Sequence, residues 1–400
     1  MFRDCFRPLS GILLIMGTCI GAGMLALPIA TGVAGFVPAI AVNLLCCLFM
    51  MATGLLLLEA VLWLEDGVNV LSLSEHFLGK CGKVIAGISF VFLYYCLQVA
   101  YCAGGAPIFS EVIHGLIGIK ITGFFSYVIF AAFFGSIVLF GTRTVDRCNW
   151  LLMAGLFISF ILLMGAGSTH VQGKLLEWVD WKLSLAATPV LFGAYGYHNV
   201  LPSLATYLKR NANHLRISVI AGSLGSFFIY SLWQWLIIGT LTVEELQAAD
   251  LRGEPVTQTL QNIVGNPWLR HFGEYFGFFA LVTSFLGVSL SMVDFLGDGL
   301  KMKRTGVSRG ILCAAVFIPP VLFAAANPGI FIEAIGVAGG FGEAILNGLL
   351  PIAVVWVGRY LYHLPSVYRL GGGRTLLVVL LLFTLLIMGI EANHLFFNKV

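Results

Sequence analysis

Charge is scarce in this sequence. Asp, Glu, Lys and Arg make up only 10% of its 400 residues, and the formal net charge is +3. Soluble domains carry about 25% charged residues, and a surface that binds nucleic acid needs runs of Lys and Arg that are missing here. This shortage excludes an ordinary soluble domain and gives no reason to expect nucleic acid as a partner.

Motifs for enzyme and metal chemistry are also scarce. The chain has no GxxxxGK[ST] phosphate loop and no set of residues with the spacing of zinc ligands. Its nine cysteines lie mostly within apolar runs and lack the spacing of a disulfide framework, so we expect them to pack as small apolar residues. The sequence therefore predicts neither an enzyme nor a bound cofactor or metal.

Apolar residues dominate instead, at 59% of the chain. A helix needs about 20 mostly apolar residues to cross a bilayer. Windows of this size predict an all-α integral membrane protein with eleven spans, at residues 9–32, 36–62, 84–110, 121–141, 149–168, 185–208, 215–240, 272–297, 307–326, 329–358 and 373–393. The first span lacks the cleavage pattern of a signal peptide and ten more follow it, so we expect it in the mature protein.

The distribution of positive charge predicts the orientation. With the N-terminus in the cytoplasm, 16 of the 22 Lys and Arg residues fall in inside segments and six in outside segments, which agrees with the positive-inside rule. An odd number of spans then places the C-terminus in the periplasm. The longest outside segment, about 241–270, is consistent with either a short amphipathic helix or a solvated loop.

Two spans contain glycines and a proline at matching places. The motifs are GTCIGAGMLALP in the first span, which opens the first five, and LFGAYGYHNVLP in the sixth, which opens the next five. Glycine weakens a helix and proline removes a backbone donor, and unwound backbone survives in lipid only where protein or a water-filled cavity surrounds it. Helix breaks at corresponding positions indicate an inverted-repeat transporter with a site near the midplane. Simple kinking is the alternative.

Such breaks expose backbone groups that suit a small zwitterion. The half-helix after the first break would present free amides to a carboxylate, at Gly21, Ala22, Gly23 and Met24. Carbonyls freed before the breaks, near Cys19, Phe192 and Gly193, would suit an ammonium group or a small cation. These groups predict an amino acid as the ligand. The rings of Phe192, Tyr195 and Tyr197 favour a flat apolar side chain on it.

Two further spans carry polar faces. In the third span, steps of four, three and four place on one helical face Tyr94, Gln98, Tyr101 and Gly105. This face either lines the site or forms hydrogen bonds between helices. In the eighth span a polar stripe contains Ser284, Gly287, Ser291, Asp294 and Asp298. The hydroxyls of Ser284 and its neighbour Thr283 could help to hold a small cation, and we expect the two aspartates to pair with Lys301 and Lys303.

Three ionisable residues within spans are candidates for ion coupling, because a charge in hydrocarbon costs at least ~2.5 kcal/mol. His198 follows the sixth-span break and either titrates near neutral pH or hydrogen-bonds the unwound backbone. Glu343 lies near the centre of the tenth span and either takes part in ion coupling or is a protonated structural carboxyl. Glu59, near the inner end of the second span, is a coupling, gating or helix-packing carboxylate.

These motifs resemble those of the bacterial hydroxy and aromatic amino acid permeases, most closely the tyrosine-specific branch. The matching stretches are GTCIGAGMLALP, LLLLE ending at Glu59, VLFGAYGYHNVLPSL and TSFLGVSLSMVDFLGD. The likeness extends over nearly the whole chain. It implies a LeuT-like fold of two inverted five-helix repeats, at 1–170 and 185–358, plus one additional helix at 373–393.

The resemblance also implies which residues bind the substrate. By motif position, Thr18 and Gly21 to Leu25 would meet the substrate backbone, and the stretch from Phe192 to Asn199, with Gly196 and His198, would border its side chain. The polar faces of the third and eighth spans supply the remaining candidates for the substrate site, which are Tyr94, Gln98, Tyr101 and Ser284. No family motif contains Glu343, so its assignment depends on its depth in the membrane alone.

The implied function is import of an aromatic amino acid, tyrosine first, by proton symport across the bacterial inner membrane. A sodium-coupled symporter, with sodium at the hydroxyls of Thr283 and Ser284, stays open. A membrane receptor that binds an amino acid without transporting it is the alternative from another class. The expected partners are the amino acid, the coupling ion and the lipid bilayer, and the sequence indicates no obligate protein partner.

Overall fold

Helices make up most of the part of the chain that the structure describes. This computed structural model describes residues 7–65, 67–263 and 267–397, and no strand occurs among them. Eight helical segments there are long and apolar enough to cross a membrane. They are α4 (Phe36–Trp63), α5 (Val70–Ile117), α7 (Thr142–Gly167), α11 (Ala212–Ile238), α14 (Pro267–Gly299), α15 (Gly306–Ala326), the segment from α16 to α17 (Phe331–Tyr360) and α18 (Gly373–Phe397). The predicted all-α membrane protein is confirmed.

Three of the predicted spans take a different form. The first is a bent pair of helices that together are long enough to cross. The fourth is α6 (Phe124–Leu139), an apolar helix of 16 residues. The sixth is divided between two helices of seven residues each, α9 (Thr188–Ala194) and α10 (Leu201–Tyr207). The count of eleven spans and the ranges of the two repeats stay predictions.

The first break lies where the glycines predicted it. α2 (Arg7–Cys19) ends before the short 3-10 turn η1 (Ala22–Leu25), and α3 (Leu27–Gly32) continues from it at a bend of 49° to the first helix. Between them Gly21 is extended. A side chain at Gly21 would overlap the Ser284 hydroxyl, so glycine here allows α14 to approach the unwound backbone.

The second break follows α9. The chain leaves the helix at Tyr195, forms the 3-10 turn η4 (His198–Val200) and enters α10. Pro202 lies in the first turn of α10, where a backbone donor has no intrahelical partner in any case. Both predicted discontinuities, in the first and the sixth spans, are therefore confirmed.

The tenth span contains a feature that the sequence analysis did not predict. Between α16 (Phe331–Val337) and α17 (Leu350–Tyr360) the chain forms a π-helical segment, η5 (Ala338–Leu349). Glycines allow it to pack closely on its neighbours: a side chain at Gly339 would overlap the Pro189 carbonyl of α9, and one at Gly342 would approach Leu93 of α5 within 2.9 Å. Wide π-turns of this kind occur frequently at functional sites.

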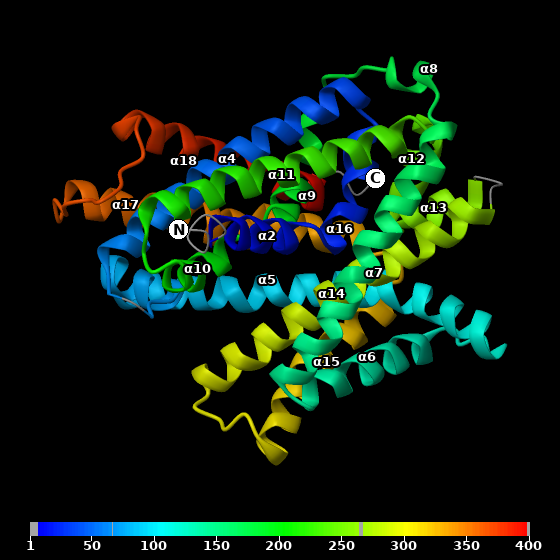
Figure 1. Cartoon of the computed structure of the whole chain (residues 1–400), viewed down its shortest axis with the longest axis horizontal. Coiled ribbons are helices and arrows are strands. Elements are labelled where there is room, and N and C mark those ends of the chain that lie inside the picture. The colour runs from blue at the N-terminus through cyan, green and yellow to red at the C-terminus, as the bar shows by residue number, and fades with distance from the viewer. Residues whose placement is uncertain (1–6, 66, 264–266, 398–400) are drawn as a thin grey trace.

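The helices form two groups with this tenth span between them (Figure 1). α2, α4, α10 and α11 pack together in one group, and α5, α6, α7, α14 and α15 in the other. α9 and η5 contact each other, while η5 and α17 also contact α5 of the second group. The tenth span therefore touches both groups.

The end of the molecule away from the start of α2 is covered by loops and short helices. Asp180 donates its backbone N–H to Ala34 at 2.8 Å, and Gln172 donates to Gly239 at 2.7 Å. The predicted outside segment 241–270 contains two short helices, α12 (Val243–Arg252) and α13 (Val256–Ile263), whose inward faces are buried. A side chain at Gly32 would approach Leu246 of α12 within 2.6 Å. These segments cover the ends of α3 and α11.

Candidate functional site

A cavity of about 450 Å³ lies between the two broken helices and the second helix group. It has the size of a small-molecule site. Nine of the predicted site residues line it: Thr18, Tyr94, Tyr101, Gly193, Gly196, Asn199, Thr283, Ser284 and Glu343. Leu13 of α2, Asn149 in the first half of α7 and Val70 at the start of α5 also contribute, so the cavity extends toward the end of the molecule where α5 begins.

Backbone groups freed by the two breaks are held by side chains of α11 and α14. The Tyr230 hydroxyl lies 2.6 Å from the carbonyl oxygen of Cys19 and 2.7 Å from that of Ala194, so one phenol spans both breaks. The Ala22 N–H donates to the Ser284 hydroxyl oxygen at 2.9 Å, and Trp233 donates to the Met24 carbonyl at 2.9 Å. These bonds stabilise the unwound backbone, as membrane burial requires.

The segment from Gly21 to Leu25 lies behind the cavity wall. Ala22, Met24 and Leu25 are buried at 1% exposure or less. The Met24 N–H donates to the Gly21 carbonyl at 3.2 Å within the tight turn. Of the residues predicted to meet the substrate backbone, Thr18 lines the cavity, while Gly21, Ala22, Gly23, Met24 and Leu25 do not.

Three aromatic residues of the sixth span, Phe192, Tyr195 and Tyr197, do not line the cavity. Phe192 stacks on Phe49 of α4 with ring centroids 4.9 Å apart. The Tyr195 hydroxyl donates to Asn43 at 2.8 Å and the Tyr197 hydroxyl donates to the Met50 carbonyl at 3.0 Å. These contacts fasten the break to α4.

His198 belongs to the same anchoring set. Its Nε2 lies 2.9 Å from the Thr53 hydroxyl of α4, its ring stacks on Tyr197, and it is 1% exposed. The residue does not line the cavity. His198 therefore contacts a side chain of α4, and not the unwound backbone considered as the alternative above.

The polar face of the third span divides between the two roles considered for it. Tyr94 and Tyr101 line the cavity, and Asn199 donates to the Tyr94 hydroxyl at 3.1 Å. Gln98 instead donates to Ser289 of α14 at 2.6 Å and is fully buried outside the cavity. Gln98 therefore joins α5 to α14.

Glu343 projects from η5 into the cavity wall. It is 4% exposed, and the Asn347 amide, one turn away, donates to its carboxyl. A side chain at Gly196 would overlap this carboxyl, so the glycine of the second break provides the space that Glu343 occupies. Among the cavity residues in the described part of the chain, Glu343 is the acidic one.

The sequence analysis missed several lining residues. Phe90, Leu93 and Leu97 extend the face of Tyr94 at helical spacing, and Asn149 and Met153 are one turn apart on α7. The spacing on α5 could have identified the first set. The sequence analysis also missed a buried carboxyl outside the cavity. Glu391 of α18 is 3% exposed and has one carboxyl oxygen without a hydrogen-bond partner.

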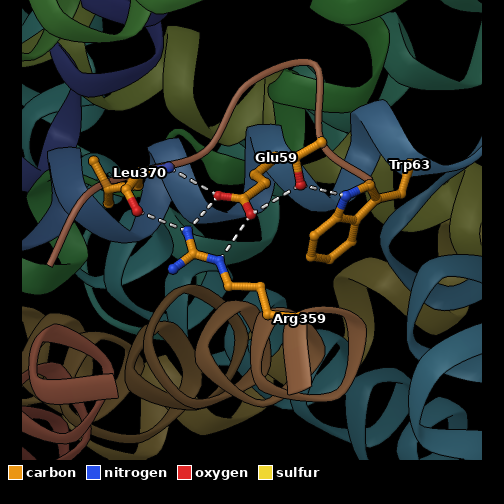
Figure 2. Close-up of polar contacts among 5 residues, drawn as sticks. Glu59, Trp63, Arg359 and Leu370 are labelled. Atoms are coloured by element: carbon orange, nitrogen blue, oxygen red, sulfur yellow. Dashed lines mark hydrogen bonds and ion pairs between the residues drawn. The ribbon is translucent and has the colours of Figure 1, made fainter. Parts of the chain in front are cut away.

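The acidic residues near the inner end have partners that the sequence did not predict. Arg304, and not Lys301 or Lys303, pairs with Asp294 and Asp298. The expected lysine pairing is therefore wrong. Glu59 is fully buried outside the cavity and accepts two hydrogen bonds from Arg359 of α17 (Figure 2).

No group of three or more His, Cys, Asp or Glu residues within the described ranges is arranged to hold a metal ion. Thr283 donates to the carbonyls of Phe279 and Ala280 in its own helix, at 2.8 and 3.2 Å. Thr283 and Ser284 both line the cavity. The site offers hydrogen-bonding side chains, aromatic rings and the carboxyl of Glu343.

Known proteins resemble this chain in sequence and in fold. The chain is 31% identical over 396 residues to the tyrosine-specific transport system 1 of Haemophilus influenzae, covering 96% of each protein. It is 30% identical to a tryptophan-specific transport protein of Pseudomonas aeruginosa, covering 94% of this chain and 92% of that protein. The crystal structure of MhsT in complex with L-phenylalanine matches with a TM-score of 0.61 at 14% identity, over 95% of this chain and 98% of the other.

The match to MhsT shows the fold, which is LeuT-like. The model of the tryptophan/tyrosine permease family matches residues 7–391, nearly the whole chain. This family consists of bacterial multi-pass membrane permeases and is not a class of enzymes. The chain described here belongs to the tryptophan/tyrosine permease family.

Proposed function

We propose that this protein imports an aromatic amino acid, with tyrosine preferred, across the bacterial inner membrane together with a proton. The observation that carries the proposal is the cavity between the two broken helices, which combines aromatic rings, polar groups and one buried carboxyl. The names of relatives at about 30% identity point to tyrosine and tryptophan. The distribution of Lys and Arg supports a cytoplasmic N-terminus. In this orientation the cavity extends toward the cytoplasmic side.

The ring of the substrate is expected to pack beside Phe90 and Tyr94, which stack on each other with centroids 4.2 Å apart. Stacked and edge-on ring contacts favour aromatic over aliphatic side chains. The hydroxyls of Tyr94 and Tyr101 and the amide of Asn199 supply partners for a polar ring substituent. This combination supports tyrosine as the preferred substrate.

Glu343 is the proposed proton-binding group. A carboxylate in the membrane is costly, and binding of a proton neutralises it, while Asn347 contacts the group directly. Proton binding couples to transport if the protonated carboxyl favours one conformation of the carrier, since a ligand shifts an equilibrium only by its differential affinity.

Uptake into proteoliposomes tests the proposal. Labelled tyrosine should accumulate when an inward proton gradient is imposed, and unlabelled tryptophan and phenylalanine should compete better than serine or threonine. Replacement of sodium by choline at fixed pH should change nothing; a loss of uptake there would establish the sodium version. Binding of tyrosine without any flux would establish a receptor.

A pair of variants tests the role of Glu343. Glu343→Gln should abolish accumulation driven by the proton gradient and keep exchange of tyrosine between two equal pools. Glu391→Gln is the matched control, because Glu391 is also a buried carboxyl in a spanning helix but lies outside the cavity. Gradient-driven accumulation by the Glu343→Gln variant at the wild-type level would rule out this residue as the proton site.

A further inference from the structure

A buried ion pair joins the second and tenth spans at their inner ends. The Arg359 guanidinium donates from Nε to Glu59 Oε1 at 2.8 Å and from Nη2 to Glu59 Oε2 at 2.5 Å. Both side chains are 1% exposed or less. Figure 2 shows the two groups facing each other between α4 and α17. Charged groups so deeply buried need a close partner, and this bidentate geometry provides it.

The same pair holds the connection between α17 and α18, residues 361–372. The Leu370 N–H donates to Glu59 Oε2 at 3.0 Å, and Arg359 Nη2 donates to the Leu370 carbonyl at 2.9 Å. Trp63 of α4 donates from its ring N–H to the Ser366 hydroxyl at 2.8 Å (Figure 2). α11 adds one more contact, because the Arg216 guanidinium lies 4.7 Å from the centre of the Tyr368 ring. The inner end of α17 is thus fastened to α4, and the connection that follows it contacts both α4 and α11.

The other end of α17 is continuous with η5, the π-helical segment that carries Glu343. Within η5, Gly339 contacts the backbone of α9 and Gly342 contacts Leu93 of α5. The segment is therefore held between α9, which contacts α4 of the first group, and α5 of the second group. Glycine-rich π-turns supply a position at which a helix can bend.

We infer that Glu59 and Arg359 are positioning residues for ion coupling: they clamp α17 to α4, so that movement of the first helix group bends the tenth span at η5 and changes the surroundings of Glu343. The inference deepens the proposed function and depends on it. Without the clamp, α17 would no longer follow α4, and Glu343 would have similar surroundings in both conformations. Its proton would then cease to favour one of them.

The double variant Glu59→Gln/Arg359→Met tests the clamp, because it removes both charges and keeps similar volumes. A single variant would leave one buried charge unpaired and threaten folding. In proteoliposomes the double variant should exchange tyrosine at close to the wild-type rate and lose about tenfold in proton-driven accumulation, within the range of typical coupling energies. The control is Glu75→Gln/Lys83→Met, an ion pair at 2.6 Å that is about half exposed and should affect neither quantity.

Two results would overturn the inference: wild-type accumulation by the double variant, or equal losses of exchange and accumulation. If the wild-type protein itself shows no proton-driven accumulation, the proposed function fails first, and this outcome is distinguishable because it does not involve the variants.

A second measurement leaves the pair intact. With Cys5 and Cys81 replaced by serine, spin labels at Glu65 and Leu361 report the distance between the inner ends of α4 and α17. A label pair at Leu300 and Leu361 reports α17 against α14. Addition of tyrosine at low pH should change the second distance and leave the first constant. A change in the first distance would show that α17 is not clamped to α4.

Discussion

At the scale of single residues, the site is shaped by side chains that are absent as much as by those present. Glu343 occupies space that any side chain at Gly196 would take, and Ser284 reaches Ala22 because Gly21 has no side chain. Both glycines lie in the breaks that the sequence marked. Their role in the structure is to admit a polar group from another helix, in addition to weakening their own helix.

Gly196→Ala should therefore impair transport. The added methyl group would overlap the Glu343 carboxyl and displace it from the cavity wall, so we expect proton-driven tyrosine uptake to fall by about tenfold or more, which corresponds to ~1.4 kcal/mol. The matched control is Gly389→Ala on α18, where nothing lies within 4 Å and alanine should stabilise the helix by about 1 kcal/mol. Uptake and thermal stability of both variants check the prediction. Normal uptake by Gly196→Ala would remove the argument for this packing.

At the scale of secondary-structure elements, arginines complete the inner ends of two helices. Arg210, after α10, donates to the carbonyls of Val61, Leu62 and Leu64 at the end of α4. Arg309, in α15, donates to the Val138 carbonyl near the end of α6 at 2.7 and 3.1 Å. The last carbonyls of a helix lack intrahelical partners, and cations are favourable there. These arginines therefore add positive charge at the predicted inner side and also pair with carbonyls at helix ends.

Arg210→Met should lower stability more than it alters substrate affinity. Loss of the bonds to α4 leaves carbonyls without their partner, at a cost of about 1–3 kcal/mol, whereas the residue does not line the cavity. The midpoint of thermal unfolding in detergent and the KM for tyrosine separate the two effects. Lys209→Met, at the exposed neighbouring position, serves as the control and should change neither. A raised KM at unchanged stability would contradict the prediction.

At the scale of the whole molecule, the cavity extends toward one end while the other end is covered by loops and by α12. A carrier must open its site to each side in turn, so the described arrangement is one of at least two that the cycle requires. If the charge distribution fixes the orientation, the accessible end faces the cytoplasm. The arrangement then corresponds to a state from which substrate is released into the cell.

Native cysteines allow a test of this orientation. Among the described cysteines Cys81, on α5 near its start, is the exposed one. A membrane-impermeant maleimide should therefore label inside-out vesicles and leave right-side-out vesicles unlabelled, because Cys81 and Cys5 both lie on the side predicted to be cytoplasmic. Cys5→Ser/Cys81→Ser should abolish the labelling. Strong labelling of right-side-out vesicles would reverse the orientation.

Much of the fold was predictable because membrane burial leaves a direct signature. Apolar runs located the spanning helices, and glycine with proline located both breaks, since these residues act on their own backbone. The π-helical segment was not predictable. It depends on the close contact of Gly339 with α9 and of Gly342 with α5, and neither partner is near in sequence.

The candidate site was predictable only in part. Thr18, Tyr94 and Glu343 line the cavity, whereas Gln98, Tyr195, Tyr197 and His198 bind other helices. A polar side chain within a span must find a partner, so periodicity identifies which residues turn inward. It does not distinguish the cavity from a neighbouring helix, because both satisfy the same requirement.

The residue pattern alone placed the chain in a membrane, located the two helix breaks and identified residues that avoid lipid, because each of these follows from the cost of placing polar groups in hydrocarbon. The partners of these residues became known from the packed helices: Glu59 with Arg359, Asp294 and Asp298 with Arg304, and Glu343 with the space at Gly196. Partners 300 residues apart meet through helix packing, and the geometry of that packing is a property of all the helices together.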